Sequence, residues 1–304
     1  MKNKGTYIIK SISEYHSYMG LRKPKHPLVS VFDFSEIAFD GIENELKISC
    51  DFYVIALKKN FDGKIKYGQR YYDFDSGLMT FFAPRQTFSI EVGSSRKLEG
   101  WMLIIHPDFI QNFPLAKRIK EYGYFSYAIN EALHLSDREE IVVSALIQNM
   151  QEEIESMIDN YTQDVAVAHI DLLLNYCNRF YNRQFITRKK VSNDILLQFE
   201  DLLTIYYQND NLSTSGLPTV QYFAEKLIVS PHYLNDMLKK LTGQTTQQHI
   251  QNQLIEKAKE LLSATNLSVS EIAYQLGFEF PQSFNKFFKN KTNVTPLKFR
   301  QSFN

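Results

Sequence analysis

The sequence is poor in cysteine and tryptophan and has no excess of charge of either sign. Its two cysteines, Cys50 and Cys177, lie far apart and form no CxxC pair. A zinc ribbon or a redox motif is therefore not indicated, and both thiols are expected to be reduced. The 34 basic residues balance the 34 acidic residues, so the whole chain has no net field that would attract it to nucleic acid or to a membrane.

Long apolar runs are also missing. The run at 101–105 has only the length of a strand and falls far short of the ~18 residues of a membrane-spanning helix. The first 20 residues carry basic side chains but no apolar segment, which argues against a signal peptide. We therefore expect a cytoplasmic protein with no membrane contact. Its 304 residues are more than a single hydrophobic core usually accommodates, so two or three domains are expected.

The first third of the chain is typical of a β-domain. Short segments rich in strand formers lie at 28–34, 46–57, 78–82, 87–92 and 100–105, with turn residues between several of them. Short strands separated by turns predict a β-sandwich or a small barrel.

The pattern becomes helical in the middle of the chain. Ser136 followed by Glu139 is a capping-box signature, which predicts a helix over 136–161. A second apolar periodicity predicts a helix over 164–185, antiparallel to the first. The basic run at 188–190 is expected to be a solvated linker loop, with a phosphate contact as the alternative.

The last part of the chain contains a helix-turn-helix that occurs twice. In the first unit, the apolar residues at 220–227 have helical spacing, Ser230 and Pro231 can begin a second helix, and Gly243 can end it. Two short helices separated by a turn of about three residues form a helix-turn-helix.

The same unit recurs about fifty residues later. Ser268 and Glu271 form a capping box, Gly277 closes the first helix, and Pro281 begins the second. Between the two units, the apolar residues at 247–263 predict one continuous helix, roughly 25 Å long at ~1.5 Å per residue. With the width of each unit added, such a rod can place two recognition helices in successive major grooves, which are ~34 Å apart.

Both units also carry specific short motifs. They are SPHYL at 230–234 in the first unit, and VSEIA at 269–273, LGF at 276–278, FNKFFK at 284–289 and TPLKFR at 295–300 in the second. With these motifs, residues 191–304 resemble the DNA-binding domain of AraC/XylS-type transcriptional regulators. That family often has glycine where Asn293 stands, and asparagine also tolerates the left-handed backbone conformation.

The resemblance implies that the N-terminal part of each recognition helix meets base edges. The candidate base-reading residues are His232, Asn235, Asp236, Pro281, Gln282, Ser283, Asn285 and Lys286. Asparagine and glutamine can bond adenine, and lysine can bond guanine. Four further lysines are candidates for phosphate contacts, which position a protein without specifying sequence: Lys239, Lys240, Lys289 and Lys291.

Asp236 departs from the family, which often has arginine at this position. An aspartate cannot hold a guanine or a phosphate, but it can accept a hydrogen bond from cytosine or from a neighbouring side chain. We therefore expect the second unit to carry more of the base readout. From residue 219 onward, ten basic side chains stand against six acidic ones, a modest excess for a DNA footprint that dimerisation would supplement.

The resemblance further implies an N-terminal cupin-like β-barrel that binds a small effector, and a helical pair that dimerises. The effector-pocket candidates are Phe52, Tyr71, Phe82 and Trp101, with Tyr53, Tyr72, Phe81 and Phe88 behind them. Ordinary core packing is the alternative for each ring. The candidates for dimerisation are Leu172 and Leu173, although the helical pair can also pack only onto its own β-domain.

Two other interpretations of the N-terminal domain stay open. A cupin-type metalloenzyme would need about three histidines and a glutamate on neighbouring strands. Of the seven histidines, only His106 falls at the end of an expected strand, and there is no HxH pair. We therefore expect no metal, no cofactor and no enzyme activity. The third interpretation is a domain that binds no ligand and serves only dimerisation or a protein partner.

These observations predict an α+β fold in three parts. The parts are a cupin-like β sensor domain at 1–135, a helical dimerisation and linker region at 136–190, and an all-α DNA-binding domain with two helix-turn-helix units at 191–304. The expected partners are double-stranded promoter DNA, RNA polymerase, a small-molecule effector and a second copy of the chain.

Overall fold

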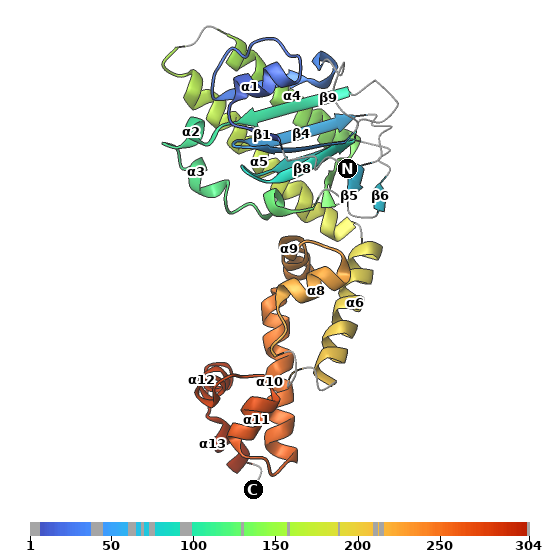
Figure 1. Cartoon of the computed structure of the whole chain (residues 1–304), viewed down its shortest axis with the longest axis vertical. Coiled ribbons are helices and arrows are strands. Elements are labelled where there is room, and N and C mark those ends of the chain that lie inside the picture. Colours follow the sequence, from blue (N-terminus) through green and yellow to red (C-terminus); the bar gives the residue numbers. More distant parts are fainter. Residues whose placement is uncertain are drawn as a thin grey trace. The chain divides into compact units, whose positions relative to one another are not determined.

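The computed structural model describes residues 7–37, 45–59, 65–67, 70–72, 77–91, 99–128, 131–156, 159–187, 189–208, 212 and 216–302. The chain divides into two compact units, Met1–Gln184 and Phe185–Asn304 (Figure 1). None of the helices in the described ranges combines the length and the apolar character that a membrane span requires.

The first unit is built from strands followed by helices. The strands are β1 (Tyr7–Ile9), β2 (Val29–Asp33), β3 (Glu45–Cys50), β4 (Tyr53–Lys59), β5 (Ile65–Tyr67), β6 (Arg70–Tyr72), β7 (Leu78–Phe82), β8 (Thr87–Glu91), β9 (Glu99–Ile105) and β10 (Leu133–His134). The helices are α1 (Ile12–Tyr18), α2 (Pro107–Ile110), α3 (Leu115–Arg118), α4 (Asp137–Glu155) and α5 (Thr162–Thr187), with short 3-10 helices at Phe34–Glu36 and Gly123–Ser126.

The strands form two principal sheets. The larger has the order β10-β7-β4-β9-β2 and is antiparallel throughout, whereas the smaller has the order β1-β3-β8 and pairs β1 with β3 in parallel. Strands β5 and β6 form a separate antiparallel pair. The strands predicted from sequence are confirmed, except that the segment at 46–57 divides into β3 and β4.

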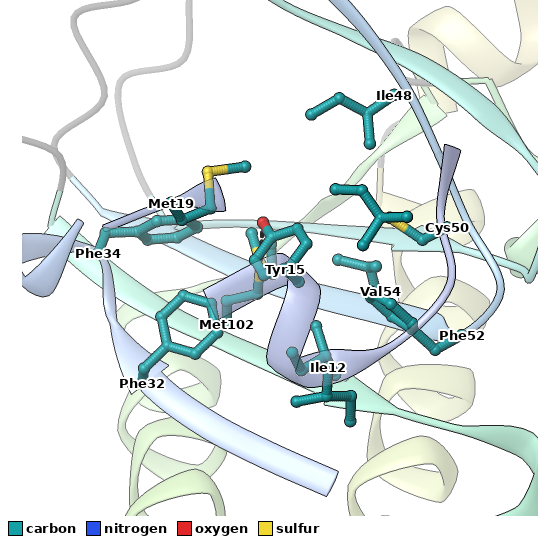
Figure 2. Packing of buried hydrophobic residues seen from close by; sticks show 13 residues of the cluster. Ile12, Tyr15, Met19, Phe32, Phe34, Ile48, Cys50, Phe52, Val54 and Met102 are labelled. Atoms are coloured by element: carbon teal, nitrogen blue, oxygen red, sulfur yellow. Dashed lines mark hydrogen bonds between the residues drawn. The ribbon is translucent and has the colours of Figure 1, made fainter. Parts of the chain in front are cut away.

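Both faces of the five-stranded sheet are buried. On one face, Val54 of β4 and Met102 of β9 join a buried cluster with side chains of the smaller sheet and of α1 (Figure 2). On the other face, Met79 of β7 lies against Cys177 of α5, with the two sulfurs 3.8 Å apart, and α4 packs on β2. This double burial explains why β4 and β9 are nearly continuous apolar runs instead of alternating ones.

The predicted closed barrel is not what the described strands form. Strands β10 and β2 end the larger sheet and strands β1 and β8 end the smaller one, so among the described pairings no ladder joins the two sheets into a ring. The space between them is filled by side chains, including those that α1 contributes to the shared core cluster. The mixed helical and β character of the chain is confirmed.

Helix α1 was not predicted, although its sequence carries a local signal. Ser11 accepts a hydrogen bond from the backbone N–H of Glu14 at 3.1 Å, the arrangement of an N-cap. Ile12, Tyr15 and Met19 then follow at helical spacing and are fully or almost fully buried (Figure 2). The helix is short, so its stability depends on this burial more than on propensity.

The predicted helical pair corresponds to α4 and α5. Ser136 and Glu139 form the predicted capping box, and α4 ends earlier than expected because Ser156 is extended. Up to Gln184, these helices belong to the first compact unit. The linker loop predicted at 188–190 is wrong for Lys189 and Lys190, since α6 begins at Lys189; Arg188 lies outside the described residues.

The second unit is helical. Its helices are α6 (Lys189–Gln208), α8 (Val220–Leu227), α9 (Pro231–Thr242), α10 (Thr246–Ala264), α11 (Val269–Gln275), α12 (Pro281–Thr292) and α13 (Pro296–Gln301). Helices α8 and α9 form the first predicted helix-turn-helix, and α11 and α12 form the second. Phe199 of α6 packs on Phe223 of α8, with ring centroids 5.2 Å apart.

The two turns share the same hydrogen bonds but not the same residue at the left-handed position. The N–H of Val229 donates to the carbonyl of Ala224, and the N–H of Phe278 donates to that of Ala273, at 3.0 and 2.9 Å. The second turn uses Gly277, with φ +83, where a Cβ would lie 2.8 Å from the carbonyl oxygen of Leu212. That position accepts only glycine, both for its conformation and for its space.

The first turn has Ile228 at the same position, with φ 57 and ψ 44. A β-branched residue in this region is strained, at a cost of about 1–2 kcal/mol. The Ile228 side chain is exposed, so burial does not offset the cost.

We expect Ile228→Gly to stabilise the full chain by about 0.5–1 kcal/mol, since relief of strain exceeds the added entropy of the unfolded state. Urea unfolding followed by helical circular dichroism measures this. Ile205→Gly is the matched control, because Ile205 is also exposed but lies inside α6, where glycine destabilises. A loss of stability in Ile228→Gly would contradict the assignment of strain.

Candidate nucleic-acid interface

The two recognition helices, α9 and α12, are built alike. Each is 12 residues long and begins with proline. Each ends at a left-handed residue, Gly243 with φ 77 and Asn293 with φ 62, so the predicted tolerance of asparagine at this position is confirmed. The buried stripe of α9 contains Leu234 and Leu238, and that of α12 contains Phe284 and Phe288. One side of each helix is therefore fixed in its own unit and the opposite side faces solvent.

Helix α10 joins the two units as one continuous helix. Its 19 residues correspond to about 28 Å, and Thr245 with Gln248 forms its capping box. The predicted linking helix is thus confirmed, extended by one residue at each end.

Side chains from both units hold the ends of α10. At the end near the first helix-turn-helix, Thr242 Oγ1 lies 2.8 Å from Nε2 of His249. Burial lowers the pKa of this histidine, which keeps it neutral at pH 7. The hydroxyl of Tyr207 donates to the carbonyl of Ile250 at 3.0 Å. In the second unit, Nε of Arg300 donates to the carbonyl of Leu262 at 3.1 Å. The spacing of the recognition helices is therefore set by one rod with both ends anchored.

Most of the predicted base-reading side chains lie on the solvent side of these helices. The exposed ones are His232, Gln282, Ser283, Asn285 and Lys286, whereas Asn235, Asp236 and Pro281 are half-buried. The predicted phosphate-contacting lysines, Lys239, Lys240, Lys289 and Lys291, are all exposed.

Two of the predicted base readers already have local hydrogen bonds. Nδ2 of Asn235 lies 3.4 Å from Oδ1 of Asp236, so the Asp236 carboxylate contacts a neighbouring side chain, one of its two predicted roles. Nδ2 of Asn285 donates to the carbonyl of Pro281 at 3.1 Å, one turn earlier in α12. Each amide nitrogen carries two hydrogens, so each of these asparagines keeps a second donor that can reach adenine.

The charge of the two recognition helices is uncompensated. Among the described residues, none of Lys239, Lys240, Lys286, Lys289 and Lys291 forms an ion pair, whereas Lys257 and Lys259 of α10 pair with Glu260 and Glu256 at 3.1 and 2.7 Å. Five lysines without an ion pair in the described part of the chain thus lie on α9 and α12, where they can meet phosphates.

Two of the four predicted effector candidates belong to the core of the first unit or pack on it. Phe52 is fully buried in the cluster of the first unit (Figure 2), and Phe82 packs against that cluster. Trp101 is half-buried, and the side chain of Tyr71 lies outside the described residues. Within the described ranges, no three metal-ligating side chains lie close enough to hold an ion.

The two dimerisation candidates point to different sides of α5. Leu172 is 46% exposed, whereas Leu173 is 0% exposed and belongs to the core of its own unit. Adjacent helix positions point about 100° apart, so only Leu172 can contact a second chain.

One exposed side chain beside α12 was missed. Phe280, the residue before Pro281, is the N-cap of the helix, makes no capping hydrogen bond through its side chain, and is 56% exposed. The sequence did not reveal this role, since phenylalanine is not a typical N-cap residue.

Comparison with known proteins agrees with this geometry. Residues 223–302 match a family described as a helix-turn-helix domain, which covers both units and α10. Residues 223–302 thus form an AraC-type helix-turn-helix domain.

Several relatives of this chain are named as regulators. The HTH-type transcriptional regulator YijO of Escherichia coli (strain K12) is 25% identical over 221 residues, 73% of this chain and 68% of YijO. The bifunctional transcriptional activator/DNA repair enzyme AdaA of Bacillus subtilis (strain 168) is 34% identical over 104 residues. That match covers 34% of this chain, which spans about half the length of AdaA (48%).

Among solved structures, a transcriptional regulator of Chromobacterium violaceum described as containing an AraC-type DNA-binding domain is similar to this chain. It is 21% identical with a TM-score of 0.33, and the match covers 37% of this chain and 94% of that one.

We expect Arg300→Ala to cost about 1.5–3 kcal/mol of stability, because the Leu262 carbonyl at the C-terminal end of α10 loses a charged donor. Urea unfolding of the full chain measures the change. Lys298→Ala removes an exposed cation of α13, the helix that carries Arg300. Its stability is expected to stay within about 0.5 kcal/mol of the parent. Equal effects of the two substitutions would show that the bond to α10 does not contribute.

Proposed function

We propose that this chain is a sequence-specific, non-enzymatic transcriptional regulator that binds promoter DNA through α9 and α12. The observation that carries the proposal is the pair of equal recognition helices held on one continuous helix, with exposed amides and lysines on both. The partners that follow are double-stranded DNA, RNA polymerase and a second copy of the chain.

A DNA selection with the full chain tests this function, using random genomic fragments at about 150 mM salt, where non-specific phosphate contacts are weakened. We expect recovery of a defined site, in which the bound protein protects two successive major grooves. A triple substitution of Gln282, Ser283 and Lys286 by alanine should abolish recovery, whereas Lys120→Ala, which removes an exposed lysine of the first unit, should not. Recovery of random fragments by the parent chain would refute a sequence-specific regulator.

We propose that the second helix-turn-helix, α11 and α12, carries most of the base readout. Lys286 is exposed and can bond guanine, whereas the Asp236 carboxylate is half-buried and contacts Asn235. In gel shifts on the selected site, we expect Lys286→Ala to weaken binding by about tenfold, within the range of a lost base contact. Asp236→Ala is expected to weaken binding by less than about threefold. A larger loss for Asp236→Ala would reverse the assignment.

We also propose that α5 contributes a dimer contact. Val165, Ala168 and Leu172 are exposed at i, i+3 and i+7 of this helix, a spacing that forms an apolar stripe typical of helix pairing. A dimer would place two copies of the reading unit on one DNA molecule and raise the affinity of each.

We expect Leu172→Glu to convert a dimer to a monomer without loss of helix content, as measured by sedimentation and circular dichroism. Leu197→Glu is the control, since Leu197 is exposed on α6. Leu173→Glu cannot serve, because it buries a charge and is expected to unfold the first unit. A dimer that survives Leu172→Glu would exclude this face.

We propose further that the first unit binds a small effector and that α1 is the element that responds. The Tyr15 hydroxyl is buried, and its bond to Sδ of Met102, at 3.1 Å, is to a weak acceptor. A ligand with a better acceptor would be favoured at this position. Thermal shift against metabolite pools tests it: a hit that Tyr15→Phe abolishes supports the sensor, and no hit favours a ligand-free dimeric regulator.

A further inference from the structure

Phe280 occupies an unusual position for a large apolar side chain. It immediately precedes α12 and is 56% exposed. The neighbouring Phe278 is buried and packs against Phe284 and Phe287 in tilted arrangements, with ring centroids 5.4 and 5.6 Å away. Within the described residues, Phe280 joins no such ring contact. Its ring is therefore not needed to fill the core of the second unit.

The corresponding residue of the first helix-turn-helix is Ser230. Comparison of the two residues shows which capping hydrogen bond is lost with Phe280. Ser230 Oγ accepts a hydrogen bond from the N–H of Tyr233 at 3.2 Å, which satisfies one free donor at the start of α9. Phe280 provides no such bond at the start of α12. The second unit thus gives up an N-cap that commonly stabilises a helix and exposes an aromatic ring instead.

The surroundings of Phe280 indicate what covers this ring. Gln282 and Ser283 follow it within the first turn of α12 and are exposed, and Lys286 is exposed one turn further. These side chains form the proposed base-reading end of the helix. An aromatic ring at that end meets the floor of the major groove, where the 5-methyl group of thymine is the apolar feature that a phenylalanine can contact.

We propose that Phe280 is a specificity-determining residue that contacts the 5-methyl group of a thymine at the edge of the site read by α12. The inference rests on the proposed DNA-binding function and deepens it. It predicts a readout without hydrogen bonds, next to the polar readout by Gln282, Ser283 and Lys286. The second unit would then prefer thymine over cytosine at one position, because cytosine lacks the methyl group.

The test replaces each thymine of the selected site in turn by deoxyuridine, which removes only the methyl group, and measures binding of the full chain. The parent chain is expected to lose about fourfold in affinity at one position, the factor that corresponds to burial of one methyl group. Phe280→Ala is expected to bind the unmodified site more weakly by a similar factor or more and to be indifferent to deoxyuridine at that position. Indifference of the parent chain at every thymine, or equal sensitivity of Phe280→Ala, would overturn the proposal.

Two further variants separate recognition from folding. Phe280→Ser restores a capping hydroxyl and is expected to raise the melting temperature while it loses the same affinity as Phe280→Ala. Tyr274→Ala removes a ring of α11 that is 55% exposed, and it is expected to keep the deoxyuridine response of the parent. If Phe280→Ser binds as the parent does, the ring does not contribute to DNA binding and the thymine assignment fails. Failure of the parent chain to select any site would refute the DNA-binding function itself, a result distinct from selection without methyl sensitivity.

Discussion

The anchoring of α10 at both ends is the constraint on which the second unit depends. A helix of this length is not rigid on its own account, and neither recognition helix has enough buried surface to hold a fixed orientation alone. The contacts of His249 and Tyr207 at one end and of Arg300 at the other convert the helix into a spacer. Because these contacts involve polar groups that are at least partly buried, loss of one partner leaves the other unsatisfied. The distance between the two reading surfaces is thus fixed by residues that lie outside these surfaces.

The repeat is symmetric in backbone and asymmetric in chemistry. Helices α9 and α12 share their length, their initial proline and their left-handed terminus. Their reading ends differ: Ser230 caps α9 while Phe280 is exposed before α12, and Asp236 stands where the second unit has Lys286. The backbone requirements of the motif are met by a few cap and turn residues, so the solvent-facing positions are free to differ. A duplicated unit can therefore divide its work between phosphate contact and base readout.

Features that depend on short-range chemistry could be predicted from the sequence. The caps at Ser136, Ser230 and Ser268 and the left-handed residue Asn293 involve residues only a few positions apart, and each is confirmed. The arrangement of the first unit could not be predicted in the same way. Whether strands close into a barrel depends on pairings between distant segments, and α1 occupies the interior through contacts with both sheets.

Residues at neighbouring positions raised a similar difficulty. Leu172 and Leu173 are equivalent by composition, and only the packing of α5 on its own sheet shows that one is buried and the other exposed. In the candidate interface, the reading residues could be placed because each recognition helix begins with a proline. Phe280 was missed because the cap itself was replaced by an apolar side chain. Strain at Ile228 was also invisible, since the sequence shows that a turn is present but not which residue takes the left-handed conformation.

The fixed length of α10 also determines how the protein responds to insertions in its target. B-DNA turns once in about 10.5 base pairs, so one extra base pair between the two contacted grooves rotates the second by roughly 34° about the duplex axis. A flexible tether would absorb that rotation, but a helix anchored at both ends cannot twist independently of its recognition helices. For a chain that binds DNA as proposed, operator variants are consequently sorted by helical phase: a half-turn insertion moves one subsite to the opposite side of the duplex.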